Sequence, residues 1–249
     1  MDPTWLLIAG LVFLVAAIYS SVGHGGASGY LFVLSFFSFT TAEMSTTALL
    51  LNILVAGTAF TSYAAARYFR PRVLFAFLVT STPMAFIGGL IHVPPITYAL
   101  LLALALTASA LRIAWSGPRS TTEEAETRPI SLPIALATGG VVGLVSGIVG
   151  VGGGIFLSPI LLIARWATLK QTAAVSAAFI VVNSVSGLAG RLASNQFVAG
   201  ELLWLVPVAF LGGVIGAYSG AWKLGAVPLR WLLAFVLVIA AGKLIVTAL

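Results

Sequence analysis

Three features of the 249-residue sequence predict an all-α polytopic membrane protein: its composition, its long apolar runs and an internal duplication. Hydrophobic residues make up 60% of the chain and charged residues only 7%, which leaves too few charges to solvate a globular surface in water. Short polar stretches separate the apolar runs, as is typical of helices that cross a bilayer. The duplication predicts two inverted repeats of about five helical segments each.

Ten apolar segments are expected. A helix needs about 20 apolar residues to cross the hydrocarbon core, and segments 28–39 and 153–164 are too short to cross comfortably. Both follow a glycine cluster, so each repeat is expected to start with a Gly-rich broken or re-entrant helical hairpin. The ten segments are 5–22, 28–39, 46–66, 73–91, 96–114, 132–149, 153–164, 172–190, 201–220 and 229–247.

The basic residues favour hairpins over broken helices that cross only once. Cytoplasmic loops are enriched in Lys and Arg, and hairpins place ten of the 12 basic residues inside, with only Arg191 and Lys243 outside. Broken helices that cross only once would place eight basic residues inside and four outside. Both termini are therefore expected outside a bacterial inner membrane. The ten residues expected inside are Arg67, Arg70, Arg72, Arg112, Arg119, Arg128, Arg165, Lys170, Lys223 and Arg230.

The two halves of the chain resemble each other. Residues 83–91 (PMAFIGGLI) match residues 207–215 (PVAFLGGVI), with six of nine positions identical. Residues 22–26 (VGHGG) match residues 149–153 (VGVGG), with one exchange of histidine for valine. Such a duplication is a reason to treat the halves as structural repeats before any motif is interpreted.

An odd number of crossings in each half would turn the second half upside down relative to the first. Inverted repeats with interrupted helices are a transporter architecture, with the binding site near the midplane where the interruptions meet. The expected units are a first transmembrane repeat (1–116), a cytoplasmic linker (117–131) and a second transmembrane repeat (132–249).

The sharpest local features are the glycine clusters that begin at Gly23 and Gly150. Glycine allows a helix to break inside the bilayer, but the freed N–H and C=O groups then need partners from protein, water or a ligand. New helices are expected to begin near Ala27 and near Gly154, and helix N-termini attract anions. We therefore interpret both clusters as ligand contacts.

Two other glycine pairs are interpreted differently. Small residues allow membrane helices to approach closely, and this packing role is preferred for Gly88-Gly89 and Gly212-Gly213.

Neutral groups are expected to hold the ligand. No Lys, Arg, Asp or Glu is expected at mid-membrane depth, although buried charges commonly mark ion-coupling sites. The paired asparagines are preferred over hydroxyls, because Ser and Thr often bond to their own helix carbonyls. Thr46, Thr47 and Ser158 are weaker candidates. The expected substrate-binding residues are Gly23, His24, Gly25, Gly26, Ser28, Asn52, Gly150, Gly152, Gly153, Gly154, Ser176 and Asn183.

His24 is the one ionisable side chain that this segmentation places well inside the bilayer. It could carry a proton, or pair with an anion when charged. A neutral histidine bonded to a backbone carbonyl fits the sequence equally well. His92, beside Pro94-Pro95, is expected in a loop.

Gly26-Ala27-Ser28-Gly29 fits the pattern of rhomboid-type intramembrane serine proteases, in which the serine pairs with a histidine from another helix. His24 lies only four residues before Ser28, so catalysis is not expected. The chain has no cysteine, which excludes disulfides and thiolate metal sites, and no cofactor or metal is expected. The scattered basic residues do not indicate a nucleic-acid partner.

The duplicated glycine motif (150–159 with its partner at 23–29), the Pro-x-Ala-Phe-x-Gly-Gly pair and the chain length resemble the sulfite exporter TauE/SafE family, also called toluene sulfonate uptake permeases. The resemblance covers nearly the whole chain. It implies a secondary transporter of a small anion, such as sulfite or an organosulfonate. Family members that handle thiosulfate are thought to use cysteines, which this chain lacks, and His24 replaces a bulkier apolar residue or glycine.

The expected mechanism is alternating access around an anion held between the two breaks, with an anion channel at the same site as the alternative. The expected partners are a small anionic substrate and the lipid bilayer. The sequence leaves open whether a proton is the coupling ion and whether the protein forms a homodimer. The sequence leaves the substrate and the direction of transport open.

Overall fold

The computed structural model describes residues 3–37, 39–91, 94, 127–198, 200–225, 227–229, 231–232 and 235. Within these residues the chain is helical and contains no strand. Expected segment 96–114, most of segment 229–247, most of the linker and His92 lie outside the described residues. The described elements are α1 (Pro3–Ser21), α2 (Ala27–Leu34), α3 (Thr41–Ala65), α4 (Pro71–Leu90), α6 (Leu132–Val149), α7 (Gly154–Ile163), α8 (Leu169–Ala193), the 3-10 turn η2 (Glu201–Trp204), α9 (Leu205–Tyr218) and the π-helical turn η3 (Ser219–Lys223).

Six of the described helical stretches are long and apolar enough to cross a membrane. They are Pro3–Ser21, Ala42–Ala65, Pro71–Leu90, Leu132–Val149, Leu169–Ala193 and Glu201–Lys223. The expected all-α membrane class is confirmed. By contrast, α2 has 8 residues and α7 has 10, so both are as short as the sequence predicted.

Two capping boxes make α3 and α8 begin earlier than expected. The Thr40 side chain accepts from the Glu43 N–H, and the Glu43 carboxylate accepts from the Thr40 N–H. Thr168 and Gln171 form the same arrangement before α8. Each box satisfies two N–H groups that would otherwise lack a partner at a helix start. The helices therefore start at residues 41 and 169, whereas apolarity alone placed the segments at 46 and 172.

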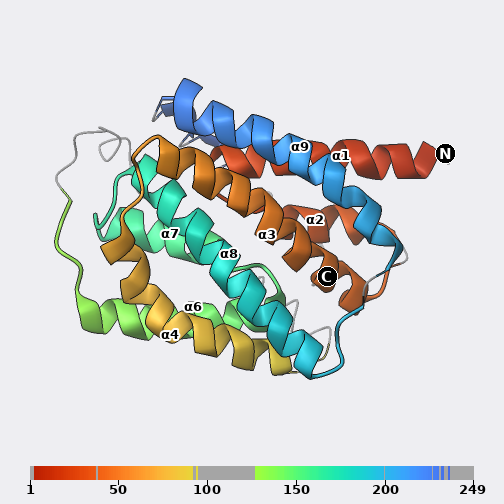
Figure 1. Cartoon of the computed structure of the whole chain (residues 1–249), viewed down its shortest axis with the longest axis horizontal. Helices are drawn as coiled ribbons and strands as arrows, with labels where there is room; N and C mark the ends of the chain where they lie inside the picture. Colours follow the sequence, from red (N-terminus) through yellow and green to blue (C-terminus); the bar gives the residue numbers. More distant parts are fainter. Residues whose placement is uncertain are drawn as a thin grey trace.

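The helices of the first half pack mainly against helices of the second half. Figure 1 shows α1 beside α9 on one side of the bundle and α4 beside α6 on the other. Between these pairs run α3 and α8, which also contact each other. The most buried helix is α8: 67% of the residues in its most apolar part are buried, against 33% for α1, so α8 forms the centre of the bundle.

The glycine pairs of α4 and α9 lie where helices approach most closely. A Cβ on Gly88 would overlap the Leu144 carbonyl of α6, and a Cβ on Gly212 would overlap the Phe13 carbonyl of α1. The prediction that these glycines serve packing is confirmed. The two contacts are also equivalent, because each joins the fourth helix of one half to the first helix of the other.

Two glycines of α6 allow a matched test of this packing. Gly143→Ala should lower the melting temperature, because its Cβ would overlap the Ser81 backbone and overpacking typically costs about 1–3 kcal/mol. Gly140→Ala is the control, because its Cβ would lie 3.8 Å from Thr80, an ordinary contact. Thermal unfolding in detergent measures both. Equal melting temperatures for the two variants would contradict close packing at Gly143.

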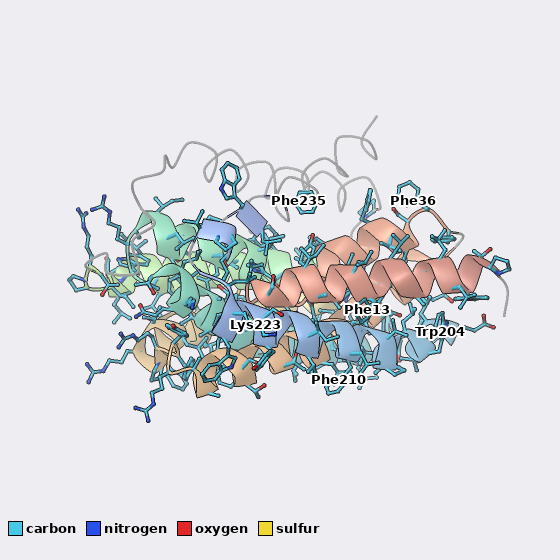
Figure 2. All side chains as sticks on the ribbon, turned by 90° about the horizontal axis from the view of Figure 1, so that it is seen from above. Phe13, Phe36, Trp204, Phe210, Lys223 and Phe235 are labelled. Atoms are coloured by element: carbon cyan, nitrogen blue, oxygen red, sulfur yellow. The ribbon has the colours of Figure 1, made fainter. Side chains whose placement is uncertain are left out.

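Most of the described basic residues gather at one end of the bundle. The Arg128 N–H donates to the Arg165 carbonyl (2.8 Å), which brings the chain before α6 to the end of α7. Lys170 Nζ, at the start of α8, donates to the Tyr68 hydroxyl (3.4 Å) between α3 and α4. In Figure 2 many nitrogen-tipped side chains extend from this end of the bundle. Arg191 lies at the other end of α8.

Candidate functional site

Two glycine-rich breaks interrupt the helical bundle. The first separates Ser21, where α1 ends, from Ala27, where α2 begins; the second separates Val149 of α6 from Gly154 of α7. The predicted helix starts near Ala27 and Gly154 are therefore correct. Both breaks use left-handed backbone, which side chains other than glycine rarely tolerate. The residues are Gly23 (φ 79°), Gly26 (φ 95°), Gly150 (φ 78°), Gly152 (φ 71°) and Gly153 (φ 79°).

The first break packs against helices from both halves. A Cβ on Gly23 would overlap the Ala173 backbone of α8, and a Cβ on Gly25 would overlap the Asn52 side chain of α3. Between these glycines, His24 places Nε2 3.2 Å from the Ser158 hydroxyl of α7. The first break is thus in direct contact with the second half.

The second break reaches the same asparagine. A Cβ on Gly152 would lie 2.9 Å from Asn52 Nδ2 and 2.7 Å from the Ser184 hydroxyl oxygen. A Cβ on Gly154 would overlap Ile180 of α8. Because Asn52 touches Gly25 on one side and Gly152 on the other, the two breaks meet at this side chain.

Asn52 leaves its amide nitrogen without a hydrogen-bond partner. Its side chain is 1% exposed, and its Oδ1 accepts from the Ala27 N–H (3.0 Å), which satisfies the first residue of α2. Asn52 Nδ2 and the neighbouring Ser184 hydroxyl have no hydrogen-bond partner and are fully buried. A buried donor without a partner costs about 1–3 kcal/mol, so both groups are suited to binding a ligand.

The other predicted polar residues differ in how far they are satisfied. Asn183 Nδ2 donates to the Phe179 carbonyl (3.0 Å), whereas its Oδ1 has no partner. Ser176 bonds to Ser158 (2.8 Å). The Ser28 hydroxyl donates to the Tyr19 hydroxyl (3.1 Å), so a group on α1 already occupies it.

The protease alternative is not favoured by these contacts. In the described residues Ser28 bonds to Tyr19, and the His24 ring bonds to Val22 and Ser158 instead. Ser28 and His24 therefore do not form a catalytic pair.

Three further polar groups beside the breaks were not predicted. The Tyr30 hydroxyl is buried without a partner, and a Cβ on Gly26 would lie 2.8 Å from it. The Ser146 hydroxyl is likewise without a partner, one turn before Gly150, and Ser184 is the third group. The sequence could have predicted Ser146 as a site residue, because it lies four residues before Gly150 and so on the same helix face. No spacing of this kind points to Tyr30 or Ser184.

Arg191 contributes a buried positive charge near the second break. Its Nη2 donates to the Ile148 carbonyl (2.9 Å) at the end of α6, where a cation complements the helix dipole. The equivalent carbonyl of the first break, that of Ser21, accepts from the Tyr63 hydroxyl (2.5 Å). The predicted segment ended at residue 190, but α8 continues to Ala193 and its packing buries Arg191.

Among the described residues, one positive charge, that of Arg191, and no acidic side chain lie beside the breaks. Glu43 and Glu201 are the only acidic residues among those described, and both lie in the first turns of helices rather than at the breaks. The described residues also contain no cluster of His, Cys, Asp and Glu that could hold a metal ion. The donors at the breaks are neutral amide and hydroxyl groups together with the Arg191 guanidinium, which donates to the end of α6.

These features define a multi-pass helical membrane protein with a buried polar site between its two halves. The chain belongs to the sulfite exporter TauE/SafE family of membrane transporters, whose sequence profile matches residues 8–244. It is 34% identical over 247 residues to the "Probable membrane transporter protein y4hK" of Sinorhizobium fredii (strain NBRC 101917 / NGR234), covering 98% of this chain and 100% of that protein. No solved structure matches the chain. The predicted family is thus confirmed.

Proposed function

We propose that the protein is a secondary transporter that moves a small anion, sulfite or an organosulfonate, through a site where the two glycine-rich breaks meet. The observation that carries this proposal is the buried, unpartnered Nδ2 of Asn52, which lies with the Ser184 hydroxyl beside Gly152. Sulfite and sulfonate oxygens accept hydrogen bonds from such donors. Hydrogen bonds to a charged partner are worth about 1.5–3 kcal/mol each, so a few neutral donors can replace much of the ligand's hydration.

The contacts of the two hairpins support the proposal of re-entrant segments. The rings of Trp5, near the start of α1, and Phe39, just after α2, lie 6.1 Å apart. In the second half, the hydrogen bond between Arg128 and Arg165 joins the beginning of α6 to the end of α7. Each pair of segments would therefore return to the side of the membrane from which it started.

The proposal of inverted repeats is supported by reciprocal helix contacts. The first helix of each half packs on the fourth helix of the other half, as α1 on α9 and α6 on α4. The third helices, α3 and α8, meet at the centre. We propose that residues 1–116 and 132–249 are the repeats and that residues 117–131 link them. Such pairs of repeats can rock around a fixed site and expose it to alternate sides of the membrane.

The proposed orientation follows from the grouping of basic residues. The contact between Lys170 and Tyr68 brings the start of α8 to the loop that contains Arg67 and Arg70. A single-crossing arrangement would have separated these residues. By the positive-inside tendency, the end with these residues would face the cytoplasm of a bacterial cell and the termini would face outward.

Binding and flux measurements test the proposal together. Sulfite, methanesulfonate and thiosulfate should be compared with chloride in a thermal-shift assay. A ligand bound only by the folded state stabilises that state by about 2.7 kcal/mol at 100 times Kd, and this raises the melting temperature. The stabilising anion should then enter proteoliposomes with saturable kinetics. Counterflow, in which unlabelled anion on one side drives labelled anion from the other, distinguishes a transporter from a channel. Neither stabilisation nor flux with any of these anions would contradict the proposal.

A further inference from the structure

A buried chain of hydrogen bonds leads from the first break into the second half. His24 Nδ1 lies 3.1 Å from the Val22 carbonyl, and Nε2 lies 3.2 Å from the Ser158 hydroxyl of α7. The Ser158 hydroxyl is 2.8 Å from that of Ser176 on α8. Exposed fractions of 2% for His24 and 0% for both serines exclude solvent from this chain in the conformation described.

The partners of His24 determine where its hydrogen lies. A carbonyl oxygen can only accept a hydrogen bond, so the Val22 carbonyl favours the neutral tautomer that carries its hydrogen on Nδ1. In this tautomer Nε2 is an acceptor for the Ser158 hydroxyl, and the backbone of Gly154, the first residue of α7, also lies within hydrogen-bonding reach of the ring. Ser176 in turn donates to Ser158. In this tautomer the chain of hydrogen bonds ends at the lone pair of Nε2.

A proton on Nε2 would reverse the contact with Ser158 and create a positive charge next to the anion site. Tyr19 of α1, Tyr30 of α2 and Tyr63 of α3 are the titratable groups that face this break, and none supplies a negative charge as a neutral phenol. On α3 the break meets Asn52, α7 has no ionisable side chain, and the charged groups of α8, Lys170 and Arg191, lie at its two ends. No carboxylate among the described residues faces the ring.

The missing counter-charge connects protonation to anion binding. His24 is adjacent to Gly25, which contacts the same Asn52 whose free Nδ2 we assign to the anion. An anion there would stabilise a cationic His24, and a cationic His24 would stabilise the anion, because opposite charges attract strongly where water is scarce. The second break has Val151 at the equivalent position, so the first break alone offers this coupling.

We propose that His24 is a proton-binding site that couples the transporter to a pH gradient, with one proton carried for each monovalent anion. The proton adds to the Nε2 lone pair, the O–H···N bond from Ser158 becomes an N–H···O bond to it, and no other covalent bond changes. The site with both ligands has the same net charge as the site with neither. This inference rests on the proposed anion transport and adds its coupling ion.

The test is the steady-state accumulation of labelled methanesulfonate in proteoliposomes with an inwardly directed gradient of one pH unit. The charge of methanesulfonate does not change near neutral pH, so pH acts through the protein alone. One-to-one coupling predicts about tenfold accumulation, because one pH unit corresponds to a factor of ten in proton activity. His24→Asn and His24→Val, the latter copying the second break, should reduce the ratio to about one. The ratio does not depend on the transport rate, so slower variants remain informative.

Each outcome separates the coupling from the transport itself. Methanesulfonate flux without accumulation in the wild type, or accumulation by His24→Asn equal to that of the wild type, would overturn the coupling and leave anion transport standing. Sulfite is measured in parallel, and because its own protonation affects all variants equally, the difference from wild type isolates His24. Absence of flux with both anions would instead reject the proposed function.

Nitrogen-15 NMR gives a second readout that needs no flux. The chain has two histidines, so His92→Asn leaves a single labelled imidazole. We expect the Nδ1–H tautomer without ligand and an imidazolium signal with saturating methanesulfonate. An Nε2–H tautomer without ligand, or an unchanged neutral ring when methanesulfonate is bound, would contradict the proposal.

Discussion

Gly152→Leu should abolish anion binding and flux while leaving the protein folded enough to be purified. A Cβ alone would lie 2.7 Å from the Ser184 oxygen and 2.9 Å from Asn52 Nδ2, so a leucine would press against both donors and block a ligand from reaching them. Leucine also disfavours the left-handed backbone at φ 71°, at a cost of about 1–3 kcal/mol. Proteoliposome flux and the anion-dependent thermal shift measure the effect.

Gly57→Leu is the matched control for this variant. Gly57 lies within α3, and a Cβ there would meet nothing within 4 Å, so a leucine would point into open space. The control protein should bind and transport at close to the wild-type level. Normal flux in Gly152→Leu, or equal losses in both variants, would count against a site at the second break.

Asn52→Asp should weaken anion binding by about 10- to 100-fold, which corresponds to the loss of one hydrogen bond to a charged ligand. The substitution keeps an oxygen that can accept from the Ala27 N–H, so the start of α2 retains its partner. It replaces the free Nδ2 donor with a carboxylate oxygen that repels an anion. The concentration dependence of the thermal shift gives the change in affinity.

Asn195→Asp controls for the added negative charge. Asn195 is exposed just after α8, and the exchange alters net charge by the same amount away from the breaks. Its anion affinity should match that of the wild type. An Asn52→Asp protein that binds anions as tightly as Asn195→Asp would show that Asn52 Nδ2 does not contact the ligand.

The positions of the breaks were predictable because they depend on local chemistry. Glycine clusters end one helix and permit another to start, so the expected starts near Ala27 and Gly154 were correct. The family could likewise be predicted from the duplicated glycine motif. Helix starts were predicted less well at Thr41 and Leu169, because the apolar pattern begins several residues after the polar capping residues that start these helices.

The contacts between the halves could not be predicted from spacing. The sequence predicts Asn52 and Asn183 as a pair, but counted from the capping residues Thr40 and Thr168, Asn183 lies three residues further along its helix. The two amides have different partners, and of the two only Asn52 touches both breaks. Burial of Arg191 depends on the carbonyls at the end of α6, among them that of Ile148, which lies 43 residues away in sequence. Such interactions arise from tertiary packing, which a single sequence does not reveal.

Anion protection of a cysteine at position 184 tests most directly whether the two breaks form one anion site. The chain has no native cysteine, so Ser184→Cys provides a single thiol beside Asn52 and Gly152. Saturating methanesulfonate, or sulfite where only sulfite stabilises the protein, should slow modification by a maleimide about tenfold or more, while exposed Asn195→Cys should react at an unchanged rate. Equal rates with and without a bound anion at position 184 would contradict a site between the breaks.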